Sequence, residues 1–108
     1  MSVTDKINVV AGLYVAFAFE ALTVASAIKT LTESVYRNSD GNYAKRALIT
    51  CETAQIRYKY NGDDPTSSEG HLLNPMDTLV IIGATNIKNF KAIRTGTTSG
   101  KIQVTYEK

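Results

Sequence analysis

The chain has 108 residues, with 12 basic and 10 acidic side chains and a formal net charge of +2 at pH 7. This length suits one domain with its own hydrophobic core, and so small a net charge does not by itself predict a polyanionic partner. Val, Ile and Thr contribute 8, 9 and 13 residues. Because β-branched side chains fit a pleated sheet, the composition predicts a single, mostly β domain over residues 1–108.

The N-terminal region resembles a secretory signal only superficially. Lys6, an apolar run over residues 9–19 and Ala25-Ser26-Ala27 imitate its three parts, but Glu20 ends the run after 11 residues, too few to span a bilayer. The chain has one cysteine, Cys51, and no Asn-x-Ser/Thr sequon. We therefore expect that the chain is neither exported nor inserted into a membrane. We also expect it to mature in a reducing cytoplasm, with Cys51 in the core.

Residues 5–31 fit two patterns. Leu13, Val15, Phe17 and Phe19 alternate with Tyr14, Ala16, Ala18 and Glu20 as in a strand, whereas a helical stripe joins Val10, Leu13, Phe17, Val24, Ile28 and Leu31, with Thr4 or Asp5 as a possible N-cap. The β-branched and aromatic content favours a strand. Residues 1–20 are then either an extended N-terminal arm or the first strand, and residues 38–42 form a surface loop.

From residue 44 onward, period-2 alternation and turn residues predict a series of short strands. The expected inward side chains are Ala47, Ile49 and Cys51; Ile56, Tyr58 and Tyr60; and Ile102, Val104 and Tyr106. The continuous apolar run at residues 79–82 predicts a strand covered on both faces, residues 87–94 predict a further strand, and residues 61–65 and 74–77 are turns. Because no long helical pattern separates the strands, we predict an all-β fold: a single antiparallel β-sandwich of jelly-roll or immunoglobulin-like topology.

Motifs that resemble catalytic or ligand sites fail on spacing. Residues 96–101 (Gly-Thr-Thr-Ser-Gly-Lys) have only three residues between the glycines and Ile102 after the lysine, so they predict a hairpin loop and not a phosphate-binding loop. Asp63 and Asp64 lack calcium-loop spacing and suit a turn. His71 is the only histidine, too few for a zinc site. We therefore expect no catalytic site, metal or cofactor, and a structural or surface role for His71.

The distribution of charge leaves two interpretations. Residues 78–108 hold five basic side chains and one acidic side chain, which indicates either a solvated sheet face or a contact with an acidic partner surface. Tyr58 and Tyr60 alternate with Arg57 and Lys59, so the aromatic rings and the cations point to opposite faces. Because a nucleic-acid groove needs both on one side, we expect no nucleic-acid partner.

Over roughly residues 44–108 the sequence resembles small structural proteins of tailed-bacteriophage virions. The resemblance lies in turn and core segments: 54–58 (Ala-Gln-Ile-Arg-Tyr), 61–66 (Asn-Gly-Asp-Asp-Pro-Thr), 70–73 (Gly-His-Leu-Leu), Ile87, 89–94 (Asn-Phe-Lys-Ala-Ile-Arg) and 104–106 (Val-Thr-Tyr). It implies a non-enzymatic capsid cement or decoration protein, or a tail component, located in the virion after assembly in the host cytoplasm. The implied partner is the major capsid protein or another virion protein, and we expect self-association.

An arm or strand in the N-terminal region and the basic side chains near the C-terminus are the expected assembly contacts: Val9, Val10, Leu13, Tyr14, Lys88, Lys91 and Arg94. The turn from Tyr60 through Gly-Asp-Asp-Pro-Thr is also similar to a hairpin of immunoglobulin-like modules attached to carbohydrate-active enzymes. This second resemblance implies an accessory sugar-binding module, for which Tyr14, Tyr36 and Tyr43 are the candidate exposed rings.

Overall fold

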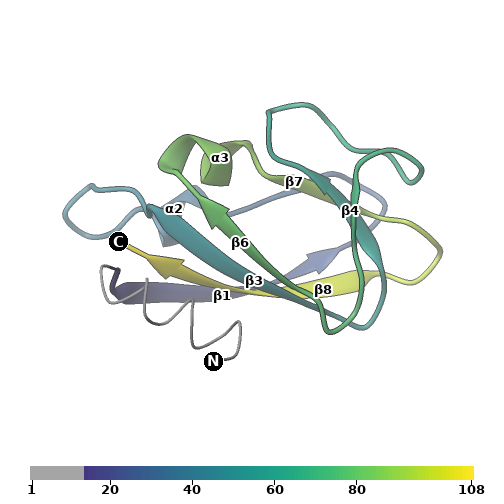
Figure 1. Cartoon of the computed structure of the whole chain (residues 1–108), viewed down its shortest axis with the longest axis horizontal. Helices are drawn as coiled ribbons and strands as arrows, with labels where there is room; N and C mark the ends of the chain where they lie inside the picture. Colours follow the sequence, from purple (N-terminus) through teal and green to yellow (C-terminus); the bar gives the residue numbers. More distant parts are fainter. Residues whose placement is uncertain (1–13) are drawn as a thin grey trace, which may run out of the picture.

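The computed structural model describes residues 14–108, and its strands form two antiparallel four-stranded sheets packed face to face (Figure 1). Sheet A has the order β1 (Ala16–Val24), β8 (Gly100–Glu107), β3 (Arg46–Glu52) and β6 (Thr78–Ile82). Sheet B has the order β2 (Lys29–Thr30), β7 (Lys91–Arg94), β4 (Ile56–Lys59) and β5 (His71–Leu73). Two short helices, α2 (Glu33–Tyr36) and α3 (Ala84–Asn89), complete the described elements.

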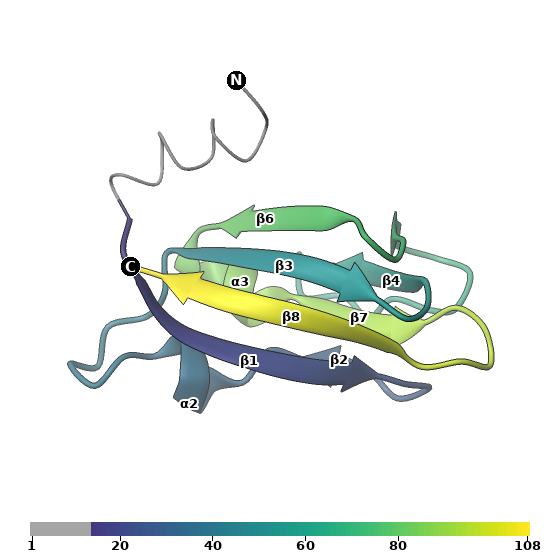
Figure 2. The same cartoon turned by 90° about the horizontal axis from the view of Figure 1, so that it is seen from below.

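The strand order is that of a jelly roll. The first strand pairs with the eighth, the second with the seventh, the third with the sixth and the fourth with the fifth, as when a long hairpin is wound into two sheets. Figure 2 shows the four strands of sheet A side by side, with β1 and β6 at its two edges. The predicted all-β sandwich is confirmed, and of the two predicted topologies the pairing is that of the jelly roll.

Side chains from the inner faces of both sheets form the core. The inward phases predicted for β3 and β8 are confirmed, since alternate residues of both strands are buried. Cys51 is buried as expected, and its Sγ lies 3.4 Å from the Ala54 carbonyl oxygen. Burial raises the pKa of this thiol, with a smaller contribution from Asp77. The largest fully buried side chains are Tyr106, Phe90, Ile49, Ile56, Ile87, Ile102, Val24 and Val104.

The first described strand is β1, as the β-branched and aromatic content indicated. The alternation in the sequence left open which of its two faces is inward. An irregularity in pairing lies between Ala16 and Ala18, and beyond it Phe19 points outward with 59% of its surface exposed. Glu20 takes the inward phase and accepts hydrogen bonds from the Tyr106 hydroxyl and the Thr32 amide. These bonds compensate the half-buried carboxylate, which lets Leu22 and Val24 reach the core from the same face.

Four further predictions are corrected. Residues 87–94 do not form one strand, because α3 precedes β7. Residues 95–99 link β7 in sheet B to β8 in sheet A, so the glycine-rich stretch is a connection between sheets and not a hairpin. Tyr60, expected in the core, is 42% exposed. The apolar run of β6 lies at a sheet edge, with Ile82 57% exposed, and is not covered on both faces.

Candidate docking surface

One row of side chains crosses the outer face of sheet A. The register places Phe19 of β1 beside Thr105 of β8, Thr105 beside Leu48 of β3, and Leu48 beside Val80 of β6. We call these four residues the apolar row. Phe19 is exposed, and the other three are half-buried. Among residues 14–108 no strand or helix packs over this face. The row therefore aligns three apolar side chains across the sheet, with Thr105 between Phe19 and Leu48.

An ion pair lies along one side of the apolar row. In the next row of the sheet, Arg46 lies between Glu107 and Ile82. Arg46 is only 3% exposed, and its Nε donates a hydrogen bond to Glu107 Oε1. The Tyr14 ring lies 4.9 Å from the Arg46 guanidinium carbon, which suits a cation–π contact. Tyr14, Arg46 and Glu107 thus hold the residues that precede β1 close to β3, and they mark one side of the apolar row.

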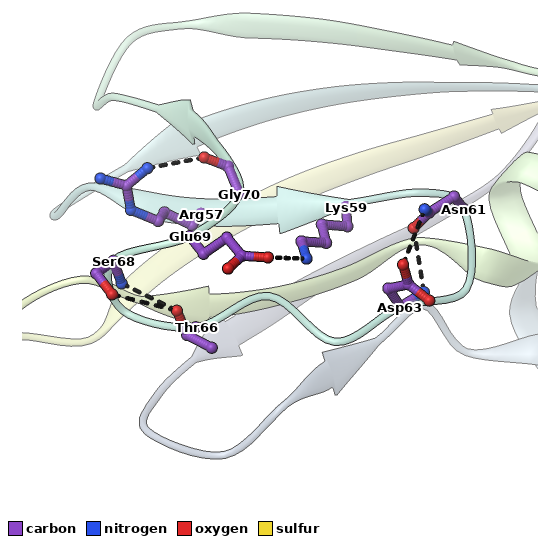
Figure 3. Close-up of polar contacts among 8 residues, drawn as sticks. All are labelled: Arg57, Lys59, Asn61, Asp63, Thr66, Ser68, Glu69 and Gly70. Carbon is purple, nitrogen blue, oxygen red and sulfur yellow. Dashed lines mark hydrogen bonds and ion pairs between the residues drawn. The ribbon is translucent and has the colours of Figure 1, made fainter.

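The outer face of sheet B differs because the loop of residues 60–70 lies across it (Figure 3). Arg57 Nη1 donates to the Gly70 carbonyl at 2.7 Å, and Lys59 Nζ donates to Glu69 Oε1 at 2.7 Å. Lys91 Nζ reaches the Gly62 carbonyl and the Asp64 carboxylate at 2.9 and 3.0 Å. The outward-facing cations Arg57, Lys59 and Lys91 thus bind the 60–70 loop to the outer face of sheet B.

The described members of the predicted assembly contacts lie at separate places on the molecule. Val9, Val10 and Leu13 lie outside the described residues, whereas Tyr14 is half-buried beside Arg46. Lys88 is exposed on α3. Lys91 is held by the 60–70 loop, and Arg94, three residues along the same strand, takes the opposite phase and lies near Ser99. Asp64 therefore neutralises one of the basic side chains in the C-terminal region, Lys91.

The three candidate sugar-binding tyrosines do not form a flat exposed platform. Tyr36 is 5% exposed and packs edge-on against Tyr106 at 5.8 Å. Burial, and then the nearby Glu33 carboxylate, raise the pKa of the Tyr36 phenol. Tyr43 is 43% exposed, and its hydroxyl bonds to Glu33. Of the three rings, only Tyr43 is presented to solvent.

His71, on β5, belongs to an aromatic cluster with Tyr58 and Tyr60. Its ring centroid lies 5.4 Å from that of Tyr58 and 6.3 Å from that of Tyr60. The adjoining cavity, about 520 Å³, is lined by Lys59, Tyr60, Asn61, Gly70 and His71, a lining that holds no carboxylate. Within the described part of the chain, no three His, Cys, Asp or Glu side chains are grouped so that they could hold a metal ion.

Sequence reasoning missed the residues of the apolar row. Leu48 and Val80 belong to strands that were predicted, but their alignment with Phe19 depends on the register of four strands that are far apart in the sequence. The outward position of Phe19 was not predicted, because alternation alone did not show which face of β1 is inward. The useful signal was Glu20 together with Leu22 and Val24, which share one phase and mark the inward face.

In comparisons with known proteins, no family model, no curated protein and no solved structure matches the chain. In residues 14–108 neither helix has the length and apolar character needed to cross a membrane.

Proposed function

We propose that this chain is a non-enzymatic structural protein of a tailed-bacteriophage virion, a cement or decoration protein that binds the major capsid protein. The observation that carries the proposal is the apolar row on the outer face of sheet A, which no element of residues 14–108 covers. The jelly-roll order, which occurs in viral capsid domains, and the sequence resemblance give it further support.

A docking surface of this kind suits a repeated lattice. Phe19 presents a large apolar ring on a backbone held by β8, so little conformational entropy is lost when a partner covers it. Leu48 and Val80 extend the contact in the same row. Each copy needs only a modest interface, because many copies on one shell add up to durable attachment.

The test uses particles of the phage whose genome carries this gene, prepared with the gene deleted. Purified protein is added back, and both its occupancy on the particles and their resistance to heat are measured. We expect the wild-type chain to rebind and to restore resistance, and Phe19→Ser to weaken binding at least tenfold. Leu72→Ser is the matched control, because Leu72 is 45% exposed on β5 of sheet B.

Two outcomes would contradict the proposal. Particles that lack the protein could keep their composition and heat resistance, which would remove the structural role. Alternatively, Phe19→Ser and Leu72→Ser could bind equally well, which would remove the apolar row as the contact.

A further inference from the structure

The four sheet edges differ in how they are protected against pairing with another strand. Unprotected edges invite strand addition, and proteins block them with charges, bulges or very short strands. The β1 edge has a pairing irregularity near Ala16 and carries Glu20. The β2 and β5 edges are only two and three residues long. The remaining edge, β6, has the sequence Thr-Leu-Val-Ile-Ile over five residues, without charge, proline, glycine or bulge.

Hydrogen bonds at both ends of β6 show which backbone groups face the free edge. The Gly83 amide donates to the Lys45 carbonyl, and the Cys51 amide donates to the Asp77 carbonyl. In an antiparallel ladder the bonded positions alternate, so Leu79 and Ile81 bond to β3. The N–H and C=O groups of Thr78, Val80 and Ile82 therefore point away from the sheet.

Most of these outward groups have no partner among residues 14–108. The Asn86 side chain donates to the Ile82 carbonyl at 2.9 Å, and this is the one hydrogen bond that covers the outward edge of β6 in the described part of the chain. On the inner side, a cleft of about 260 Å³ between β6 and the rings of Tyr58 and Tyr60 lies open along the strand. The edge thus combines free backbone groups with apolar side chains on both faces.

We propose that β6 binds the β6 strand of a second copy of this chain in antiparallel register, with the two-fold axis at Val80. Val80 of each copy then exchanges two backbone hydrogen bonds with Val80 of the other. The Ile82 amide of each copy donates to the Thr78 carbonyl of the other, so the dimer gains four bonds without disturbing Asn86. Two four-stranded sheets become one sheet of eight strands. This inference does not depend on the virion role.

The sequence of β6 favours a second copy as the occupant because it is complementary to itself. In the proposed register Asp77 lies opposite Gly83 of the second copy, so the two Asp77 carboxylates are kept apart. Val80 meets Val80, and Thr78 lies beside Ile82. A surface that pairs with itself about a two-fold axis gives a closed dimer and not a fibre. The apolar rows of the two copies then run continuously across the axis.

A disulfide test reports the register directly. In a Cys51→Ala background, Val80→Cys and Ile82→Cys are compared in the full chain under mild oxidation. Paired Val80 positions have Cα atoms about 5.5 Å apart, within disulfide range. The two Ile82 positions are offset by four residues, about 13 Å along the strands. We expect a covalent dimer from V80C and none from I82C, and equal or reversed yields would overturn the register.

Sedimentation equilibrium tests the association itself. Because pairing of five-residue strands buries little surface, we expect a weak dimer in the wild-type chain. Val80→Lys should raise its dissociation constant at least tenfold by placing two cations together, whereas the β-branched, uncharged Val80→Thr should change it less than threefold. A wild-type chain that is monomeric up to about 1 mM overturns the proposal. So does a dimer that V80K leaves intact, which would lie on another surface such as the outer face of sheet A.

Discussion

On sheet B, three outward cations of β4 and β7 hold the 60–70 loop through carbonyl and carboxylate oxygens of the same chain. On sheet A, the apolar row has no such cover among the described residues. Long cationic side chains bind loop oxygens with direction, whereas short apolar side chains can bind only another apolar surface. We infer that the loop-covered face contributes to folding stability, and that the face left uncovered by residues 14–108 is accessible to a partner.

Among the variants that test this difference between the two faces, we expect the largest loss of stability at Gly70, where the 60–70 loop leads into β5. Gly70 has a φ of +131°, and a Cβ there would lie 3.2 Å from the Tyr58 carbonyl oxygen and from Pro65 Cβ. Gly70→Ala should lower the free energy of unfolding by about 2–4 kcal/mol, because positive φ and the close contacts oppose the native loop. Urea denaturation measures this change.

Gly41 is the matched control for Gly70. It has a φ of +83°, but a Cβ there would meet nothing within 4 Å. Gly41→Ala should cost only about 1 kcal/mol, from its backbone conformation alone. Equal losses for the two variants would show that contact between the loop and sheet B adds nothing.

The next effect concerns Arg57, which donates to the Ser67 and Gly70 carbonyls. Arg57→Met keeps much of the apolar stem but removes both donors, and should lower the free energy of unfolding by about 1–3 kcal/mol. Hydrogen exchange should speed up for amides of the 60–70 loop, and the slowest amides of β3 and β8 should speed up by the factor that the lower free energy of unfolding sets. Arg37→Met is the control, because Arg37 makes only an exposed pair with Glu33 at 3.9 Å. Exchange of the loop amides that stays at the wild-type rate would contradict a role for Arg57 in holding the loop.

Much of the sandwich was predictable from local alternation, because β8 buries every second residue and β3 does so from Ala47 onward. The inward face of β1 was not predictable, because apolar residues occupy both faces of this strand. The partners that let Glu20 point inward, Thr32 and Tyr106, are 12 and 86 residues away. Helix α3 has six residues, too few to show a helical period.

The docking surface was less predictable than the fold. A continuous apolar run such as that of β6 suits a strand buried on both faces, and only the strand order shows that it is an edge. Lys91 donates hydrogen bonds to Asp64 and Gly62, which lie 27 and 29 positions earlier in the sequence. Formal charge along the sequence therefore overstated the cationic surface near the C-terminus.

On sheet A, removal of the exposed ring should have little effect on stability. Phe19 is 59% exposed, so Phe19→Ser should change the free energy of unfolding by no more than about 0.5 kcal/mol. Retention on a hydrophobic-interaction column should nevertheless fall, since the variant removes the most exposed member of the apolar row. A loss of stability as large as that expected for Arg57→Met would show that this face supports the fold and is not reserved for docking.

The smallest effect is expected from the exposed pair of Lys59 and Glu69. The hydrogen bond from Lys59, and then its charge, hold the pKa of Glu69 below its usual range. The folded state therefore binds fewer protons than the unfolded state in mild acid. The contribution of the pair is present above the ordinary carboxyl pKa and is lost as pH falls through the lowered value.

Because Glu69 is 72% exposed in this pair, solvent and salt screen the interaction. Glu69→Gln should slightly flatten the acid side of the stability–pH curve at low salt, and this difference from the wild-type chain should vanish at high salt. Denaturation midpoints across the acid range measure both effects. If Glu69→Gln lowered the midpoint as much as Arg57→Met, the ion pair would be the main attachment of the loop. The half-buried Arg57, bonded to main-chain carbonyls, is the stronger attachment because its donors are less open to water.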